Sequence, residues 1–207
     1  MKIIFILLTV FATSLFADYI GEAKHYESIN EYSKAVEYFE KSCKSANADG
    51  CNAAGYYYDI GVGVSTDRVK AKQFFELACD GGNMNGCYHL GAIYQFAKGV
   101  PKDHAKAQRL YIEACNGGDH FSCKDLGSTY YYGDEDTKKD YHLAAKFMKK
   151  SCDIGNSGAC GFLAMYYENG EGVRQSYSKA KEYYGIACDT GIQAGCKGYS
   201  RLQKEGY

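Results

Sequence analysis

Residues 79–87 read Cys79-Asp-Gly-Gly-Asn-Met-Asn-Gly-Cys87, and this stretch decides how the whole chain is organised. Two cysteines eight residues apart recur along the sequence, and successive pairs follow every 36 residues, with one interval of 37. A fixed period of this length is the signature of a repeat protein. The pairs are Cys43 and Cys51, Cys79 and Cys87, Cys115 and Cys123, Cys152 and Cys160, and Cys188 and Cys196.

Other residues keep the same register after the second cysteine of each pair. The third and fourth positions hold Ala54-Gly55, Leu90-Gly91, Leu126-Gly127 and Leu163-Ala164, and the seventh holds Tyr58, Tyr94, Tyr130 and Tyr167. Spacings of three and four place these residues on one face of a helix, where the small residues let a neighbouring helix approach. A glycine-rich turn and a second helical stretch follow. Each repeat is therefore two antiparallel helices.

The sequence predicts an all-α chain of helix pairs. The first helix of each pair is expected near 19–28, 50–61, 86–98, 122–133, 159–170 and 195–205, and the second near 31–45, 67–80, 103–116, 140–153 and 176–189. The one-residue insertion falls in the loop 133–140. We expect a single repeat domain over 18–207, with units near 18–49, 50–85, 86–121, 122–158 and 159–194 and a final helix over 195–207.

The cysteine pairs are expected to be structural disulfides. Residues eight apart on a continuous helix lie about 12 Å apart, whereas the Cα atoms of a disulfide need roughly 4.4–6.8 Å, so the chain must reverse between them. A glycine three residues after the first cysteine marks a left-handed helix end. The histidines share no register position and no cofactor motif is recognisable, so we expect no metal and no cofactor. The glycines are Gly82, Gly118, Gly155 and Gly191.

The N-terminal residues 1–17 have the pattern of a secretory signal peptide. Lys2 precedes the apolar run Ile3–Leu15, and cleavage is expected near Ala17. We therefore predict a secreted or periplasmic protein, in which disulfides persist, without a membrane anchor. The charges nearly balance, with 24 basic against 25 acidic residues, which argues against a nucleic-acid partner.

The run Leu90-Gly91, Tyr94, Gly99-Val100, Asp103, Lys106-Ala107 and Ala114 resembles the Sel-one-like repeat. The cysteine pairs at spacing eight make the chain similar to the Helicobacter cysteine-rich proteins, an epsilon-proteobacterial branch of that repeat class. The resemblance implies a right-handed, tetratricopeptide-like solenoid of αα-hairpins whose concave groove binds peptides or proteins. It also implies a β-lactam ligand, because members of the family are labelled as penicillin-binding proteins or weak β-lactamases.

The motifs of a serine β-lactamase are incomplete in this sequence. Ser176 to Lys179 and Ser178 to Lys181 match the Ser-x-x-Lys pattern, and Ser45-Ala-Asn47 matches Ser-x-Asn, but no Lys-Thr-Gly element occurs. Ser178 is interpreted as a helix cap. No catalytic residue is assigned, and the incomplete motifs favour a protein that is not an enzyme.

A stripe along the predicted first helices is the candidate binding groove. Tyrosine suits a binding surface because it offers contact area, a hydroxyl group and few torsions, and an ordinary solvated face is the alternative. The leading hypothesis is an exported scaffold for an unidentified protein or peptide. The alternatives are a penicillin-binding protein or weak β-lactamase, and an envelope assembly factor that docks peptides. The stripe comprises Asn52, Tyr56, Tyr88, Gln95, Lys124, Ser128 and Tyr131.

Overall fold

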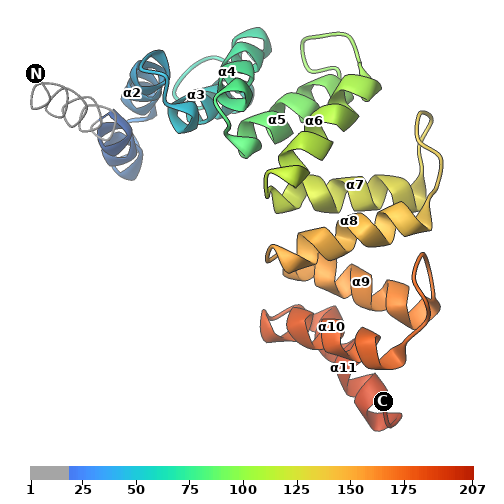
Figure 1. The fold of residues 1–207 in the computed structure, drawn as a ribbon. Coiled ribbons are helices and arrows are strands. Elements are labelled where there is room, and N and C mark those ends of the chain that lie inside the picture. The colour runs from blue at the N-terminus through green and yellow to red at the C-terminus, as the bar shows by residue number, and fades with distance from the viewer. Residues whose placement is uncertain (1–18) are drawn as a thin grey trace, which may run out of the picture. The chain divides into compact units, whose positions relative to one another are not determined.

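The computed structural model describes residues 19–207, so the predicted signal peptide and its cleavage near Ala17 lie outside the described residues. Within this range the secondary structure is helical throughout, with no β-strand. Residues 19–28 are helical, and ten further helices follow (Figure 1): α2 (Tyr32–Lys44), α3 (Ala48–Ile60), α4 (Arg68–Asp80), α5 (Met84–Gln95), α6 (His104–Asn116), α7 (His120–Tyr132), α8 (Tyr141–Asp153), α9 (Ser157–Asn169), α10 (Tyr177–Asp189) and α11 (Gln193–Lys204). From residue 19 onwards, no helix combines the length and apolarity needed to cross a membrane.

The predicted all-α chain of helix pairs is confirmed, but the first helices begin earlier than expected. Helices α3, α5, α7, α9 and α11 each start two residues before the predicted boundary. For four of them the reason is a side-chain cap, because Asn47 accepts a hydrogen bond from Gly50 N at 2.9 Å and Asn83 accepts one from Gly86 N at 2.8 Å, whereas Ile192 before α11 forms no such bond. Asp119 and Asn156 cap α7 and α9 in the same way, satisfying backbone donors that the first turn leaves unpaired.

Four of the second helices are anchored to a tyrosine in the last turn of the preceding first helix. The carbonyl of Tyr94 accepts a hydrogen bond from the backbone N–H of Asp103, the N-cap position before α6, at 3.1 Å, and equivalent bonds join Asp67 to Tyr58, Asp140 to Tyr130 and Ser176 to Tyr167. The one-residue insertion therefore leaves this joint intact. The extra length is taken up by a turn in which the Asp134 carboxylate accepts from the backbone of Asp136 and Thr137.

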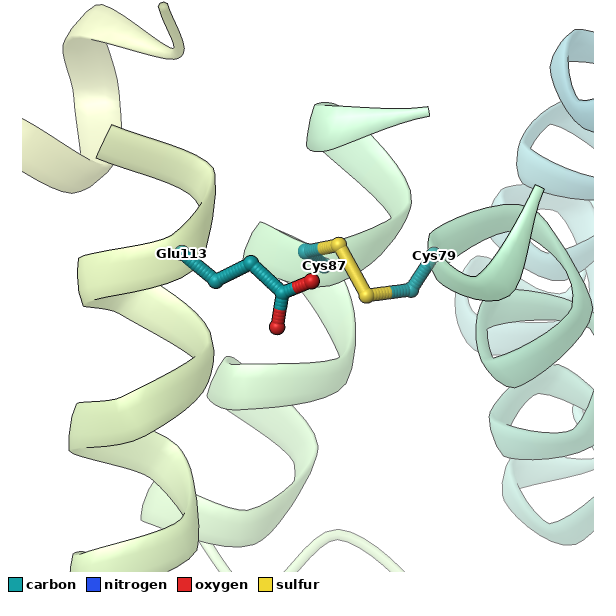
Figure 2. A group of neighbouring side chains, drawn as sticks. All are labelled: Cys79, Cys87 and Glu113. Carbon is teal, nitrogen blue, oxygen red and sulfur yellow. A yellow bond between two sulfur atoms is a disulfide. The ribbon is translucent and has the colours of Figure 1, made fainter. Parts of the chain in front are cut away.

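Five disulfides join the end of each second helix to the start of the next first helix, as the sequence predicts. Each bridge links cysteines eight residues apart, with Cα atoms 4.4–4.8 Å from one another, and Figure 2 shows the Cys79–Cys87 bond. Because both sulfur atoms of each pair are oxidised, neither is a thiolate that could act as a nucleophile or a metal ligand. The predicted glycines at the helix ends all have positive φ, from +85° at Gly82 to +101° at Gly118.

The chain divides into two compact units, which run up to Leu110 and from Tyr111 to Tyr207. In the first, Val36, Phe39 and Tyr57 pack with small residues into a buried cluster, and in the second Met148, Leu163 and Tyr166 do the same. The small register positions allow the expected close approach of helices. A Cβ added at Gly55 would lie 2.8 Å from the Phe75 ring, and one at Gly127 would lie 2.9 Å from Met148.

Replacing Ala46 with glycine is expected to stabilise the protein by about 0.5–1 kcal/mol. Ala46 occupies the position that the later repeats give to glycine and has φ +61°, a conformation that costs a residue with a Cβ about 1–2 kcal/mol. The greater freedom of glycine in the unfolded chain offsets part of that gain. Denaturant unfolding followed by circular dichroism measures the change.

The matched control is the reverse substitution, Gly82→Ala. Gly82 has φ +85° and open space around its missing Cβ, so only backbone strain changes and a loss of about 1 kcal/mol is expected. A lower midpoint for Ala46→Gly than for the parent chain would show that this helix end is not strained.

Candidate functional site

In the first unit the predicted stripe lies on α3 and α5. Tyr56 on α3 is 46% exposed, and its ring centroid lies 6.2 Å from that of His89 on α5. His89 in turn stacks on the buried ring of Phe75 at 4.9 Å. The exposed ring of Tyr56 is therefore connected to the core through His89 and Phe75, and these contacts limit its motion.

The polar members of this part of the stripe differ in their hydrogen bonding. Gln95 Oε1 lies 3.1 Å from His104 Nδ1, and nearby Asp59 pairs with Lys98 at 2.9 Å. Asn52 Oδ1 is shielded from solvent and has no hydrogen-bond partner among the described residues. Tyr88 is half-buried and its ring contacts His89.

In the second unit the stripe lies on α7 and centres on Tyr131. Its ring stacks on Tyr166 at 5.0 Å with an interplanar angle of 9°. It meets Tyr132 and Tyr141 edge-on at 4.9 Å and 5.3 Å. The Tyr131 hydroxyl donates a hydrogen bond to Glu171 Oε2 at 3.1 Å. The structure therefore brings together four tyrosine rings and a carboxylate from three helices and one turn.

The remaining stripe residues of α7 are partly buried and polar. Lys124 Nζ lies 3.4 Å from the carboxylate of Asp125, its neighbour in the chain, and Ser128 is half-buried. An exposed ion pair of this kind contributes little to stability.

The tyrosines next to the register position divide sharply by burial. Tyr56 and Tyr132 are exposed, at 46% and 64%, whereas Tyr57 and Tyr166 are buried in the core clusters. Burial raises the pKa of the Tyr166 hydroxyl, and burial together with Glu27 raises that of Tyr57. Burial and Glu171 likewise raise the pKa of Tyr131. These phenols are neutral hydrogen-bond donors at physiological pH and not bases.

Tyr141 and Glu171 belong to the cluster around Tyr131, and neither is part of the stripe predicted from the sequence. Tyr141 follows the insertion loop as the first residue of α8, and Glu171 lies between Gly170 and Gly172 in the turn after α9. The sequence signal for Glu171 was a carboxylate in a Gly-x-Gly-Val turn whose counterpart, Gly61-Val-Gly63-Val64, has valine.

The register tyrosines join neighbouring helices. Tyr58 stacks on Phe74 of α4 at 5.8 Å, and its hydroxyl donates to Glu40 of α2 at 2.7 Å. Lys70 completes this group, because its ammonium donates to Glu40 at 2.8 Å and to the Tyr58 hydroxyl at 2.5 Å. The lysine–tyrosine hydrogen bond recurs between Lys106 and Tyr94 at 2.8 Å, which explains why lysine recurs at this position of the repeat.

Two of the residues that match lactamase motifs, Ser176 and Asn47, act as helix caps. Ser176 is the N-cap of α10 and its hydroxyl accepts a hydrogen bond from Lys179 N at 3.3 Å, so the sequence interpretation of Ser178 as the cap is wrong. The misplacement is two residues, because Ser176 has the extended backbone of a cap, whereas Ser178 already lies within the helix. Asn47 of the Ser-x-Asn match caps α3.

The Sel1 repeat matches this sequence five times, over residues 28–47, 48–83, 85–119, 120–156 and 157–191. Four of these matches begin at or within one residue of the first residue of α3, α5, α7 or α9. The repeat that the cysteine spacing indicates is therefore the repeat of a known family. A comparison with curated proteins found no match.

Several solved structures share the fold. A Sel1 repeat protein from Oxalobacter formigenes superposes with a TM-score of 0.75 at 22% identity, over 85% of this chain and 72% of that one. A Sel1 repeat protein from Klebsiella pneumoniae gives 0.57 at 22% identity, over 91% and 93%. Cysteine-rich protein B of Helicobacter pylori is 32% identical, with a TM-score of 0.51, over 63% of this chain and 92% of its own. The first two similarities concern the fold alone.

Proposed function

Because this chain belongs to the Sel1 repeat family, we propose that it is an exported, disulfide-bonded scaffold that binds a protein or peptide through the stripe on its first helices. The single observation that carries this proposal is the ring of Tyr56, which is 46% exposed and lies against His89, itself stacked on the buried Phe75. Aromatic residues of this kind supply most of the binding energy in many protein interfaces, and a fixed ring loses little entropy when a partner binds.

Five disulfides support the exported location. Disulfides persist in oxidising compartments and are rare where thiols are kept reduced, and all the cysteines of residues 19–207 are paired. Secretion or a periplasmic location after cleavage near Ala17 is therefore part of the proposal. Proteolytic mapping of the N-terminus of the mature protein tests it, and an intact Met1 in the purified native protein would contradict it.

The scaffold function is preferred to β-lactam hydrolysis because Ser176, the serine of one lactamase-like match, serves as a helix cap. A chromogenic β-lactam assay on purified protein tests the alternative. Turnover that is lost when Ser176 is changed to alanine, in a chain that keeps its helical circular dichroism, would overturn the proposed function in favour of an enzyme.

Tyr56→Ala is expected to weaken binding about five- to thirtyfold, because truncating a central aromatic residue of an interface costs about 1–2 kcal/mol. The experiment selects binders from a displayed random peptide library against residues 18–207 with all disulfides formed. The affinity of each selected peptide is then measured for the parent chain and the variant.

The control is Leu77→Ala on α4. Leu77 is also an exposed apolar residue, at 55%, but it lies on a second helix and outside the stripe. Its loss should change affinity less than twofold. Peptides that lose affinity for the Leu77 variant and keep it for the Tyr56 variant would place the binding surface on the second helices.

A further inference from the structure

Glu171 is a carboxylate without a cationic partner. It accepts a hydrogen bond from the Tyr131 hydroxyl, and none of the ion pairs found in residues 19–207 includes it. Glu168, in the same unit, provides the comparison. It also accepts from a tyrosine hydroxyl, that of Tyr184 at 3.0 Å, but Arg201 pairs with it at 2.6 Å. The tyrosine–carboxylate arrangement at Glu171 thus lacks the arginine that completes its counterpart.

The aromatic surroundings of Glu171 are open to solvent. Tyr132 is 64% exposed and Tyr141 is 40% exposed, and both rings meet the edge or face of Tyr131. Tyr131 is itself held by its stack on the buried Tyr166. The two outer, exposed rings therefore lie against the tyrosine whose hydroxyl binds the Glu171 carboxylate.

The turn that carries Glu171 is fixed to the same group of helices. His142 Nδ1 lies 2.7 Å from the carbonyl oxygen of Gly172, and a Cβ at Gly172 would overlap the backbone of Tyr141. Arg174, three residues after Glu171, is exposed and forms no ion pair with it. The carboxylate is thus positioned by its turn and has no internal cation to neutralise it.

The charge of the adjoining loop favours a cationic ligand. Residues 134–140 carry four acidic side chains and two lysines, whereas the equivalent loop 97–103 carries one acidic side chain and two lysines. The loop between Tyr132 and Tyr141 is therefore more acidic than its counterpart. Arginine fits such a surface best among cationic side chains, because its planar guanidinium donates two parallel hydrogen bonds to a carboxylate and also stacks on an aromatic ring.

We propose that Glu171, Tyr132 and Tyr141 form a binding site for an arginine side chain of a polypeptide partner. This site rests on the proposed scaffold function and specifies its partner. The partner is a polypeptide whose arginine-containing segment lies along α7 and the α8 N-terminus. Glu171 accepts the guanidinium hydrogen bonds, and Tyr132 and Tyr141 contact its faces by cation–π interaction.

The probe is the peptide acetyl-Gly-Arg-Gly-Arg-Gly-amide, titrated into residues 18–207 with isotope-labelled tyrosine rings and followed by NMR. We expect the resonances of Tyr131, Tyr132 and Tyr141 to move. Glu171→Gln should weaken binding about tenfold, because the amide keeps a hydrogen-bond acceptor but loses the charge that strengthens the bond to the guanidinium. The same peptide with lysine in place of arginine should bind several-fold more weakly.

Glu182→Gln on α10 is the matched control, because it removes the same charge from an exposed glutamate of the same unit outside the tyrosine cluster. Its affinity should stay within twofold of the parent. Equal losses of affinity in the two variants would show that only net charge matters and would contradict the site. Unchanged peptide binding by Glu171→Gln would also exclude it. If peptide selection still identifies Tyr56 while this titration fails, the arginine site alone is wrong and the scaffold function stands.

Discussion

Replacing Cys115 and Cys123 together with alanine is expected to lower the free energy of unfolding by about 2–3 kcal/mol. Both cysteines are fully buried, and their bridge closes a turn of eight residues between α6 and α7. Cross-linking such a short loop removes that much conformational entropy from the unfolded chain. Repeat proteins depend on these contributions because each repeat packs only against its neighbours. Equilibrium unfolding in denaturant measures the change.

Removing the Cys188–Cys196 bridge in the same way distinguishes the entropic contribution of a disulfide from the contribution of core packing. It closes a loop of the same length, but its cysteines are only half-buried, and Cys196 lies in α11, the last helix. Equal losses for the two double variants would assign the stabilisation to the unfolded chain, as the loop model requires. A much larger loss at Cys115 and Cys123 would assign it to core packing. No loss at either joint would contradict a structural role for the bridges.

Gly172→Ala is expected to destabilise the second unit by about 3 kcal/mol or more, the largest effect we expect of a single substitution. Gly172 has φ +69°, and an added Cβ would lie 1.8 Å from the backbone carbonyl oxygen of Tyr141. A left-handed residue with a Cβ costs about 1–2 kcal/mol, and overpacking adds about 1–3 kcal/mol. Because the contact is with backbone, a change of rotamer cannot relieve it. Denaturant unfolding and hydrogen exchange at α8 measure the loss.

The matched control is Gly155→Ala. Gly155 has φ +100°, but no atom lies within 4 Å of its missing Cβ, so only the backbone term of about 1 kcal/mol remains. The difference between the two variants isolates the close approach of the turn to α8. Equal losses would show that the turn moves away from Tyr141 without cost, and the fixed position of Glu171 would then be wrong as well.

The cysteine spacing was sufficient to predict the helix pairs and every disulfide. The reason is local, because two cysteines eight residues apart with a glycine between them can only be bridged across a turn. The predicted starts of α3, α5, α7, α9 and α11 lay two residues too late. Asn47 and Asn83, which cap the helices, lie four residues before the second cysteine of their pairs. A cap is a local signal too, and asparagine at these positions was visible in the sequence.

The sequence by itself determined the repeat and its register, because helical periodicity and loop closure act over a few residues. Only the tertiary structure decided that Tyr131 meets Tyr141 and Glu171, which follow it by ten and forty residues. It also decided that Tyr166 is buried beneath Tyr131 while Tyr132 stays exposed. Periodicity assigns a side chain to a face of its own helix, but the residue opposite it depends on how successive repeats stack, and that is set by close contacts such as Gly172 against the Tyr141 backbone.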